Sequence, residues 1–321
     1  MSHQFKVLLT IITLALITVL SSCSTLSYYG QSISGQLQLL RVQQKLKTVL
    51  QSTETSTELK QRLESIVKIR DFASDVIKLP QNNSYRSYAD IGRKYIVWNV
   101  FATPALSLQP HQSCFFIVGC LSYRGYFKKK DALVYMKTLK ARGFDTYLGG
   151  VTAYSTLGWF DDPILSGMLD KNNFELARLI FHELAHQKIY IKDDTEFNEA
   201  FADAVALIGL DYWLTANGTF VQRNDFEQQL SRENQFIELV LSYRDKLNRL
   251  YQSRQSDEQK QWRKKVIFEQ MQAAYRLLRA NWGEHDEYDD WFKHGLNNAK
   301  LAAISTYRNL VPQFIDSYRT A

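Results

Sequence analysis

Two histidines and a glutamate form the group with the most evident chemistry in this chain of 321 residues. His182 and His186 are four residues apart, so on a helix they lie one turn apart on the same face. Two imidazoles placed in this way can bind one metal ion. Glu183 directly follows the first histidine, where it can reach a water on the metal and act as a general base. The spacing therefore predicts a site for metal-assisted hydrolysis.

A second helical pattern follows the short polar break 192–195 and contributes two carboxylates. Asp194 or Thr195 can cap its first turn. Glu199 comes thirteen positions after the second histidine, and Asp203 comes one turn later. Catalytic zinc takes three protein ligands, so we expect one Zn2+ per chain, held by the two histidines and Glu199, with Asp203 hydrogen-bonded to a ligand histidine. The alternative is that these are ordinary residues of two helices, with the carboxylates on a solvated face.

The residues around the first motif indicate a helix that is buried beneath a cleft. Residues 179–181 and 184–185 are apolar, and neither Pro nor Gly interrupts 174–188. The elements predicted before this helix are strands over 95–102 and 145–154 and a helix over 131–142 with Gly143 as its C-cap.

The sequence HELAH at 182–186, followed by NEAFAD at 198–203, resembles the gluzincin arrangement of thermolysin-like and aminopeptidase-like metallopeptidases. The step from the second histidine to the glutamate is shorter than in thermolysin, so the connection must be tight, and substrate-binding elements found there are missing. Nearly the whole mature chain also resembles a family of predicted zinc aminopeptidases that are bacterial lipoproteins. The matching stretches are YYGQ at 28–31, GQL at 35–37 and NNA at 297–299. No G-A-M-E-N-like segment is present, so the aminopeptidase expectation rests on family resemblance alone.

This resemblance implies a zincin-like core and further site residues. In zincins the strand before the metal helix is typically an edge strand that holds extended substrate by main-chain hydrogen bonds. By that analogy the cleft would be lined by Gly149, Gly150, Val151 and Thr152, with the glycines allowing close approach. An ordinary strand is the competing interpretation. Gluzincins commonly use a Tyr or His to stabilise the oxyanion, and Tyr307 and Tyr154 are the candidates here.

The N-terminus is typical of a lipoprotein signal peptide. A basic residue precedes the apolar run 7–20, and Leu-Ser-Ser-Cys at 20–23 resembles a bacterial lipobox. The resemblance implies removal of residues 1–22, lipidation of Cys23 and a place in the cell envelope facing the periplasm. By family analogy, Ser24 favours the outer membrane. The alternatives are a plain secretory signal, which needs no Cys here, and an uncleaved transmembrane helix, which is normally longer.

Cys114 and Cys120 are the cysteines that remain once Cys23 is lipidated. An even number of cysteines in an oxidising compartment predicts a disulfide between them. Their separation suits a turn better than one straight strand, because a disulfide needs close Cα atoms. The alternatives are two buried free thiols, or metal ligation, for which no partner is nearby in the sequence.

The composition indicates an α+β protein that is predominantly α-helical. The chain is 45% hydrophobic, which is enough for a sizeable core, and 14 Gly and 5 Pro disfavour a sandwich or barrel. We expect a signal peptide over 1–22, a helical hairpin over 23–80, a zincin-like catalytic region with a small sheet over 81–218, and a helical subdomain over 219–321. Apolar periodicity predicts helices over 28–50, 59–72, 226–251, 259–280 and 297–307. The acidic segment 284–290 is expected to be a solvated loop, with cation binding as the alternative.

The formal net charge of +6 indicates mild attraction to an anionic membrane surface or to envelope polymers. No nucleic-acid motif accompanies this charge, so nucleic acid is not an expected partner. The expected partners are a peptide or protein substrate and, through Cys23, the membrane. The sequence predicts no oligomeric state.

Together these patterns predict zinc-dependent hydrolysis of peptide bonds by an aminopeptidase. An envelope endopeptidase is the nearest alternative. A different alternative is a lipid-anchored, non-catalytic binding protein with a structural metal site. Structural zinc sites usually have four protein ligands, commonly including Cys, and neither remaining cysteine is near the motif.

Overall fold

The computed structural model describes residues 28–115, 119–153, 155–305 and 310–320. Outside these residues lie the predicted signal peptide, the lipidation candidate Cys23 and the oxyanion candidates Tyr154 and Tyr307. The chain divides into two compact units, residues 1–43 and residues 44–321. No described helix combines the length and the apolar composition that a membrane span requires.

In the first unit the described residues 28–42 are helical. The predicted helix over 28–50 is wrong in its middle, because strand β1 (Gln43–Lys45) interrupts it and helix α2 (Leu46–Gln51) starts afterwards. The backbone N–H of Leu46 donates to the carbonyl of Arg86 at 3.3 Å. The backbone here therefore bonds to a distant segment instead of continuing a helical ladder.

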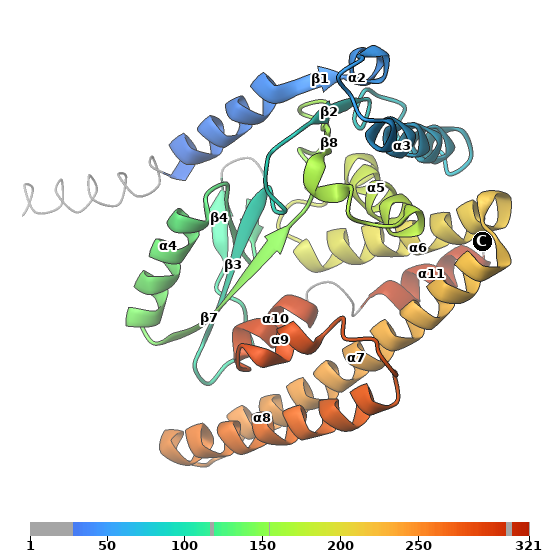
Figure 1. Cartoon of the computed structure of the whole chain (residues 1–321). Coiled ribbons are helices and arrows are strands. Elements are labelled where there is room, and N and C mark those ends of the chain that lie inside the picture. Colours follow the sequence, from blue (N-terminus) through green and yellow to red (C-terminus); the bar gives the residue numbers. More distant parts are fainter. Residues whose placement is uncertain (1–27, 116–118, 154, 306–309, 321) are drawn as a thin grey trace, which may run out of the picture. The chain divides into compact units, whose positions relative to one another are not determined.

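The second unit is α+β and predominantly helical, as predicted (Figure 1). Its longer helices are α3 (Thr57–Asp75), α4 (Lys129–Ala141), α5 (Asn173–Lys188), α6 (Thr195–Asn217), α7 (Phe220–Gln252) and α8 (Asp257–Ala280). Three short helices follow, α9 (Asp289–Lys293), α10 (Asn298–Ser305) and α11 (Val311–Thr320), and a 3-10 turn lies at Ser166–Met168. The strands are β2 (Ser87–Ala89), β3 (Val97–Pro104), β4 (Ser113–Phe115), β5 (Gly119–Leu121), β6 (Arg124–Tyr126), β7 (Phe144–Val151) and β8 (Ile164–Leu165). Each predicted helix and strand after residue 56 overlaps one of these elements.

One three-stranded sheet is antiparallel, with the strand order β6-β3-β7. Phe101 of β3 is paired with Tyr147 of β7, and both pack against α10. Trp98 points to the other face, where Lys129 of α4 lies 4.6 Å from its ring centroid. Helices α10 and α4 therefore cover opposite faces of this sheet. Strand β7 is left at the edge of the sheet as far as the structure describes it.

Helices α5 and α6 pack closely side by side. Gly209 of α6 makes this approach possible, because a Cβ there would lie 2.7 Å from Ile77 and 3.0 Å from the ring of Phe181. Leu176 and Ile180, on the inward face of α5, are fully buried. This packing sets the distance between the histidine motif and the helix that follows it.

Helices α7 and α8 form a long hairpin, and their contact is the core of the C-terminal part (Figure 1). Val240 and Leu247 of α7 belong to one buried cluster with Met271 of α8. Lys264 of α8 joins this hairpin to the sheet, because its Nζ lies 2.6 Å from the carboxylate of Asp145.

Residues 284–287 of the acidic segment are exposed, as expected of a solvated loop, but the segment enters α9 at Asp289 and two of its carboxylates form ion pairs. Glu287 pairs with Arg232 of α7 at 2.8 Å, and Asp289 pairs with Arg279 of α8 at 3.3 Å. These ion pairs join the segment to the α7–α8 hairpin.

Candidate metal centre

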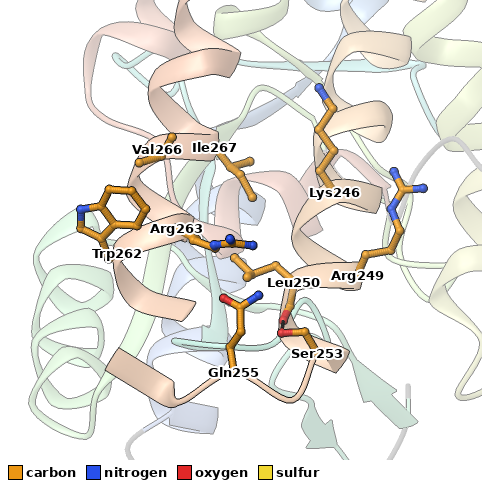
Figure 2. A pocket seen from close by; sticks show the side chains of 9 residues that line it. All are labelled: Lys246, Arg249, Leu250, Ser253, Gln255, Trp262, Arg263, Val266 and Ile267. Carbon is orange, nitrogen blue, oxygen red and sulfur yellow. Dashed lines mark hydrogen bonds between the residues drawn. The ribbon is translucent and has the colours of Figure 1, made fainter. Parts of the chain in front are cut away.

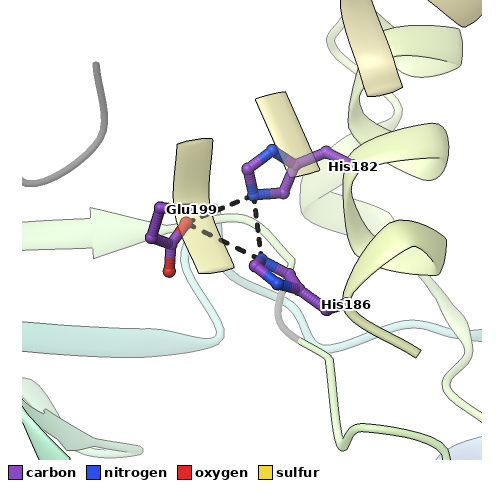
Figure 3. A group of neighbouring side chains, drawn as sticks. All are labelled: His182, His186 and Glu199. Atoms are coloured by element: carbon purple, nitrogen blue, oxygen red, sulfur yellow. Dashed lines mark hydrogen bonds and ion pairs between the residues drawn. The ribbon is translucent and has the colours of Figure 1, made fainter. Parts of the chain in front are cut away.

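Three potential ligand atoms from α5 and α6 face one another (Figure 3). Nε2 of His182 lies 3.1 Å from Nε2 of His186, and Oε2 of Glu199 lies 3.4 Å from the first and 3.7 Å from the second. In a tetrahedral zinc site with bonds of about 2.0–2.1 Å, two ligand atoms are about 3.3 Å apart. The three separations are close to this value, so the residues fit a zinc ion as three of its four ligands.

Both histidines lie on helix α5, and a capping box fixes where this helix starts. The side chain of Asn172 accepts from the backbone N–H of Glu175 at 2.9 Å, and the Glu175 carboxylate accepts from the backbone N–H of Asn172 at 3.0 Å. The helix runs without a break to Lys188. The step of four residues then places both imidazoles on one face, as their spacing predicts.

A short connection brings Glu199 back to the histidines. Asp194 caps α6, as predicted, by accepting from the backbone N–H of Phe197 at 2.9 Å. Asn198 closes the connection, because its Oδ1 accepts from the N–H of Ile191 and its Nδ2 donates to the carbonyl of Ile191, both at 2.7 Å. Asn198 therefore fixes the backbone directly before Glu199, a role that the sequence analysis did not assign.

A disulfide-bonded hairpin contacts the same connection. Cys114 of β4 lies opposite Cys120 of β5, and the two are joined by a disulfide. The backbone N–H of Cys120 donates to Oδ1 of Asp193 at 2.6 Å. Gly119 has a φ of 78°, and a Cβ there would overlap the Asp193 side chain. The structure thus places the cross-linked hairpin directly beside the link between α5 and α6.

Asp203 lies one turn beyond Glu199 and contacts the first histidine. Its Oδ1 is 3.2 Å from Nδ1 of His182, so the carboxylate accepts the Nδ1–H and leaves the lone pair of Nε2 for a metal. Arg178 approaches the same oxygen at 3.8 Å and forms a two-point ion pair with Glu233 of α7, at 2.7 and 3.3 Å. Helix α7 is thereby linked to a candidate ligand.

The second histidine has a less complete environment. Nδ1 of His186 is buried and has no hydrogen-bond partner in the part of the chain that the structure describes. Among the described residues, Asp203 thus orients the ring of His182 through Nδ1, and no carboxylate does the same for His186.

The electrostatics of the site favour bound positive charge. Burial acts against the charged form of His182, but hydrogen bonds to Asp203 and Glu199 outweigh it and raise its pKa to about 10. Burial also acts against the Glu199 carboxylate, but hydrogen bonds from His182 and His186 lower its pKa to about 2. Burial raises the pKa of Glu183. The carboxylates of Glu199 and Asp203 thus stabilise positive charge on His182, and a divalent cation at the same place would supply that charge without the proton.

A cavity of about 580 Å³ opens beside His182 and Glu183. One wall of this cavity is formed by the last two residues of β7, Gly150 and Val151, and by Thr152 directly after the strand. Gly149 precedes them and is not among the described lining residues. Position 150 requires glycine because a Cβ there would lie 2.5 Å from the ring of Tyr95. Tyr95 lines the cavity too, so Gly150 lets this ring form part of the wall.

Helix α7 forms another wall of the cavity. From sequence, this helix was expected only to pack within the C-terminal subdomain. Its lining residues are Phe226, Gln229, Leu230 and Glu233. The Phe226 ring lies 6.0 Å from that of Phe174 on α5. These positions are separated by three, four and seven residues, so they share one helical face. That periodicity was the available signal, but it does not say which partner the face meets.

A buried polar network lies behind the second histidine. Gln187 donates to Asp162 at 3.1 Å and to the Ser84 hydroxyl at 3.2 Å. Asp162 also accepts from the backbone N–H and the hydroxyl of Thr156, at 3.0 and 2.8 Å. Arg70, fully buried on α3, donates to the Ser84 carbonyl at 2.7 Å. Burial raises the pKa of Asp162 to about 7.

Comparison with known proteins adds one match. A family model described as "Putative aminopeptidase" matches residues 27–321. No curated protein and no solved structure matches the chain.

Proposed function

The chain belongs to the "Putative aminopeptidase" family, and we propose that it is a zinc-dependent peptidase with one Zn2+ per chain. The observation that carries the proposal is the triangle of ligand atoms from His182, His186 and Glu199, 3.1 to 3.7 Å apart. Glu183 lines a cavity directly beside this triangle. Two imidazoles and one carboxylate are a donor set of catalytic zinc sites, which keep one position open.

The side chains of this site divide the chemistry between them. When bound, zinc is a Lewis acid that lowers the pKa of water from 15.7 towards about 7 and polarises a carbonyl. Glu183 takes a proton from the attacking water and delivers it to the leaving amine. Burial raises the pKa of Glu183, which makes its carboxylate a stronger base. Asp203 holds the Nδ1–H of His182, which keeps that ring in the tautomer that can bind the metal.

We propose that the substrate is a peptide bound in extended form along β7. This strand is paired on one side by β3 and is an edge of the described sheet. An exposed edge offers backbone N–H and C=O groups to an added strand. The end of β7 reaches the cavity at Gly150 and Val151, and Thr152 continues this wall after the strand. In a zincin-like core an edge strand holds the substrate beside the metal-binding helix, and this is the fold we propose for the region. Strand β7 would have that role here, although the short strand β8 and a 3-10 helix lie between it and α5 in the chain.

Specificity for a free N-terminus is proposed from the family description. Two of the acidic residues that line the cavity already have partners, because Asp203 contacts His182 and Glu233 contacts Arg178.

We also propose that the protein is anchored by a lipid on Cys23 and faces the periplasm, because residues 20–23 resemble a lipobox. The endopeptidase alternative is separated by the experiment below.

The experiment measures zinc content and peptidase activity of the chain from Ser24 onward, beside Glu183→Gln. Fluorogenic peptides with a free and with an acetylated N-terminus are the substrates. We expect one zinc in both proteins, and cleavage of free-amine peptides by the wild type alone. Cleavage of acetylated peptides would make the protein an endopeptidase. Full activity of zinc-loaded Glu183→Gln would refute the mechanism, and zinc without any cleavage would point to the non-catalytic alternative.

A further inference from the structure

A second hollow lies on the α7–α8 hairpin and shares no lining residue with the cavity at the metal centre (Figure 2). It has a volume of about 410 Å³ and is formed by the end of α7, the start of α8 and the loop between them. Three lining side chains are cationic: Lys246 and Arg249 on α7, and Arg263 on α8. None of the described residues that line it carries a carboxylate. We call this hollow the basic groove.

The cations of the basic groove are exposed, and no carboxylate of the described residues pairs with them. Within the described residues, Lys246, Arg249 and Arg263 form no ion pair or hydrogen bond through their side chains, and Lys246 lies over the Tyr243 ring at 3.8 Å. The segment that contains them is basic, because residues 244–265, these three cations included, contain eight Lys or Arg against three Asp or Glu. The whole chain has a net charge of +6, so most of its excess positive charge is concentrated at this end of the hairpin.

The same groove has an apolar side. Trp262 is 65% exposed, and Val266 and Ile267 line the groove next to it. Tryptophan is favoured at the boundary between lipid and water, because its ring is apolar and its N–H is polar. An exposed tryptophan among clustered lysines and arginines is the combination that binds anionic lipid surfaces.

We propose that the basic groove docks onto anionic phospholipid headgroups, with lipid phosphates next to Lys246, Arg249 and Arg263. A small soluble anion would need several donors that enclose it, whereas the three cations of this groove are exposed and lie beside an apolar side. The inference does not depend on the peptidase chemistry or on a lipid at Cys23. A lipid anchor would add to it, because a tether raises the effective concentration of the groove at the same membrane.

Vesicle sedimentation tests the groove without the anchor. The chain from Ser24 onward contains every described residue and lacks the predicted lipidation site. It is mixed with phosphatidylcholine vesicles that either contain or lack phosphatidylglycerol. We expect binding only to the anionic vesicles. The variant Lys246→Glu/Arg249→Glu/Arg263→Glu should bind them at least about a hundredfold more weakly, since each basic side chain near such a surface contributes roughly fivefold.

A matched variant separates the groove from net charge. Lys68→Glu/Lys137→Glu/Lys140→Glu changes three exposed lysines outside the groove and alters the net charge by the same amount. It should keep most of the vesicle binding. Equal losses in the two triple variants would overturn the proposal, and so would wild-type binding by the groove variant. Circular dichroism and zinc content verify that each variant is folded.

Two further measurements complete the test. Trp262→Ala keeps every charge and should weaken vesicle binding several-fold without changing its salt dependence. No effect of Trp262→Ala would overturn the apolar part of the proposal. Inorganic phosphate at millimolar concentration should not displace the protein from vesicles, and displacement would assign the groove to a soluble anion instead.

Discussion

The guanidinium of Arg178 lies 3.8 Å from the oxygen of Asp203 that also accepts the hydrogen bond of His182. Glu233 holds the other side of this guanidinium at 2.7 Å. The four side chains come from α5, α6 and α7, so three helices meet in one charged chain that ends at a candidate metal ligand. Helix α7 of the C-terminal hairpin is thus linked to His182 through Arg178 and Asp203.

Replacing Arg178 with Gln should weaken zinc binding by about 10- to 100-fold, because Asp203 loses the cation that helps to hold it against His182. Competition with a chelator at neutral pH measures the zinc Kd. Arg223→Gln is the control, since Arg223 forms an exposed ion pair with Asp211 at 2.7 Å and such pairs contribute little. An unchanged Kd in Arg178→Gln would mean that the His182 contact alone orients Asp203.

Glu199→Gln should prevent stoichiometric zinc binding, because a neutral amide replaces the anionic ligand between two imidazoles. Metal analysis after dialysis measures the zinc that remains bound. Glu238→Gln, an exposed residue of α7, is the matched control and should keep one zinc. Full zinc content in Glu199→Gln would exclude Glu199 as a ligand.

The buried carboxyl of Asp162 should make stability fall as the pH rises. Its folded pKa of about 7 is above its ordinary value of 3.8, so the folded state binds the proton more tightly than the unfolded state. The contribution to stability is present below about pH 4 and is lost as the pH rises through about 7, by up to about 1.4 kcal/mol per pH unit. Asp162→Asn removes this component.

Urea unfolding of the metal-free wild type and Asp162→Asn, between about pH 5 and pH 7, measures the Asp162 effect. The free energy of unfolding of the wild type minus that of the variant should decrease as the pH rises. Asp225→Asn, at an exposed position, should show no such trend. A difference that does not change with pH would contradict the raised pKa.

Replacing Cys114 and Cys120 together with Ser should lower the free energy of unfolding by about 2 kcal/mol, because the bond closes a short loop in the unfolded chain. Urea unfolding of the chain from Ser24 onward measures this loss of free energy. A reductant should destabilise the wild type by a similar amount and leave the double variant unchanged. A wild type that is insensitive to the reductant would argue against the bond.

The local parts of the site could be predicted from sequence because they depend on neighbouring residues. The step of four places His182 and His186 on one helical face, and Asp194 caps the next helix through the backbone three residues ahead. Gly143 follows Arg142, the C-cap of α4, with a φ of 81°, the left-handed conformation that favours Gly directly after a helix. Residue types report these features directly, since one or two turns of backbone decide them.

Only the tertiary structure decided which distant segments complete the site. Glu233 reaches Arg178 across 55 positions, and the ring of Tyr95 takes the space that Gly150 leaves open. Periodicity shows that one face of α7 is apolar, but it does not say that Phe226 and Leu230 meet the cavity beside His182. Likewise, the helical pattern over 28–50 gives no sign of the strand at Gln43–Lys45. The reason is physical: a pattern indicates which side of an element is buried, and packing alone selects what that side is buried against.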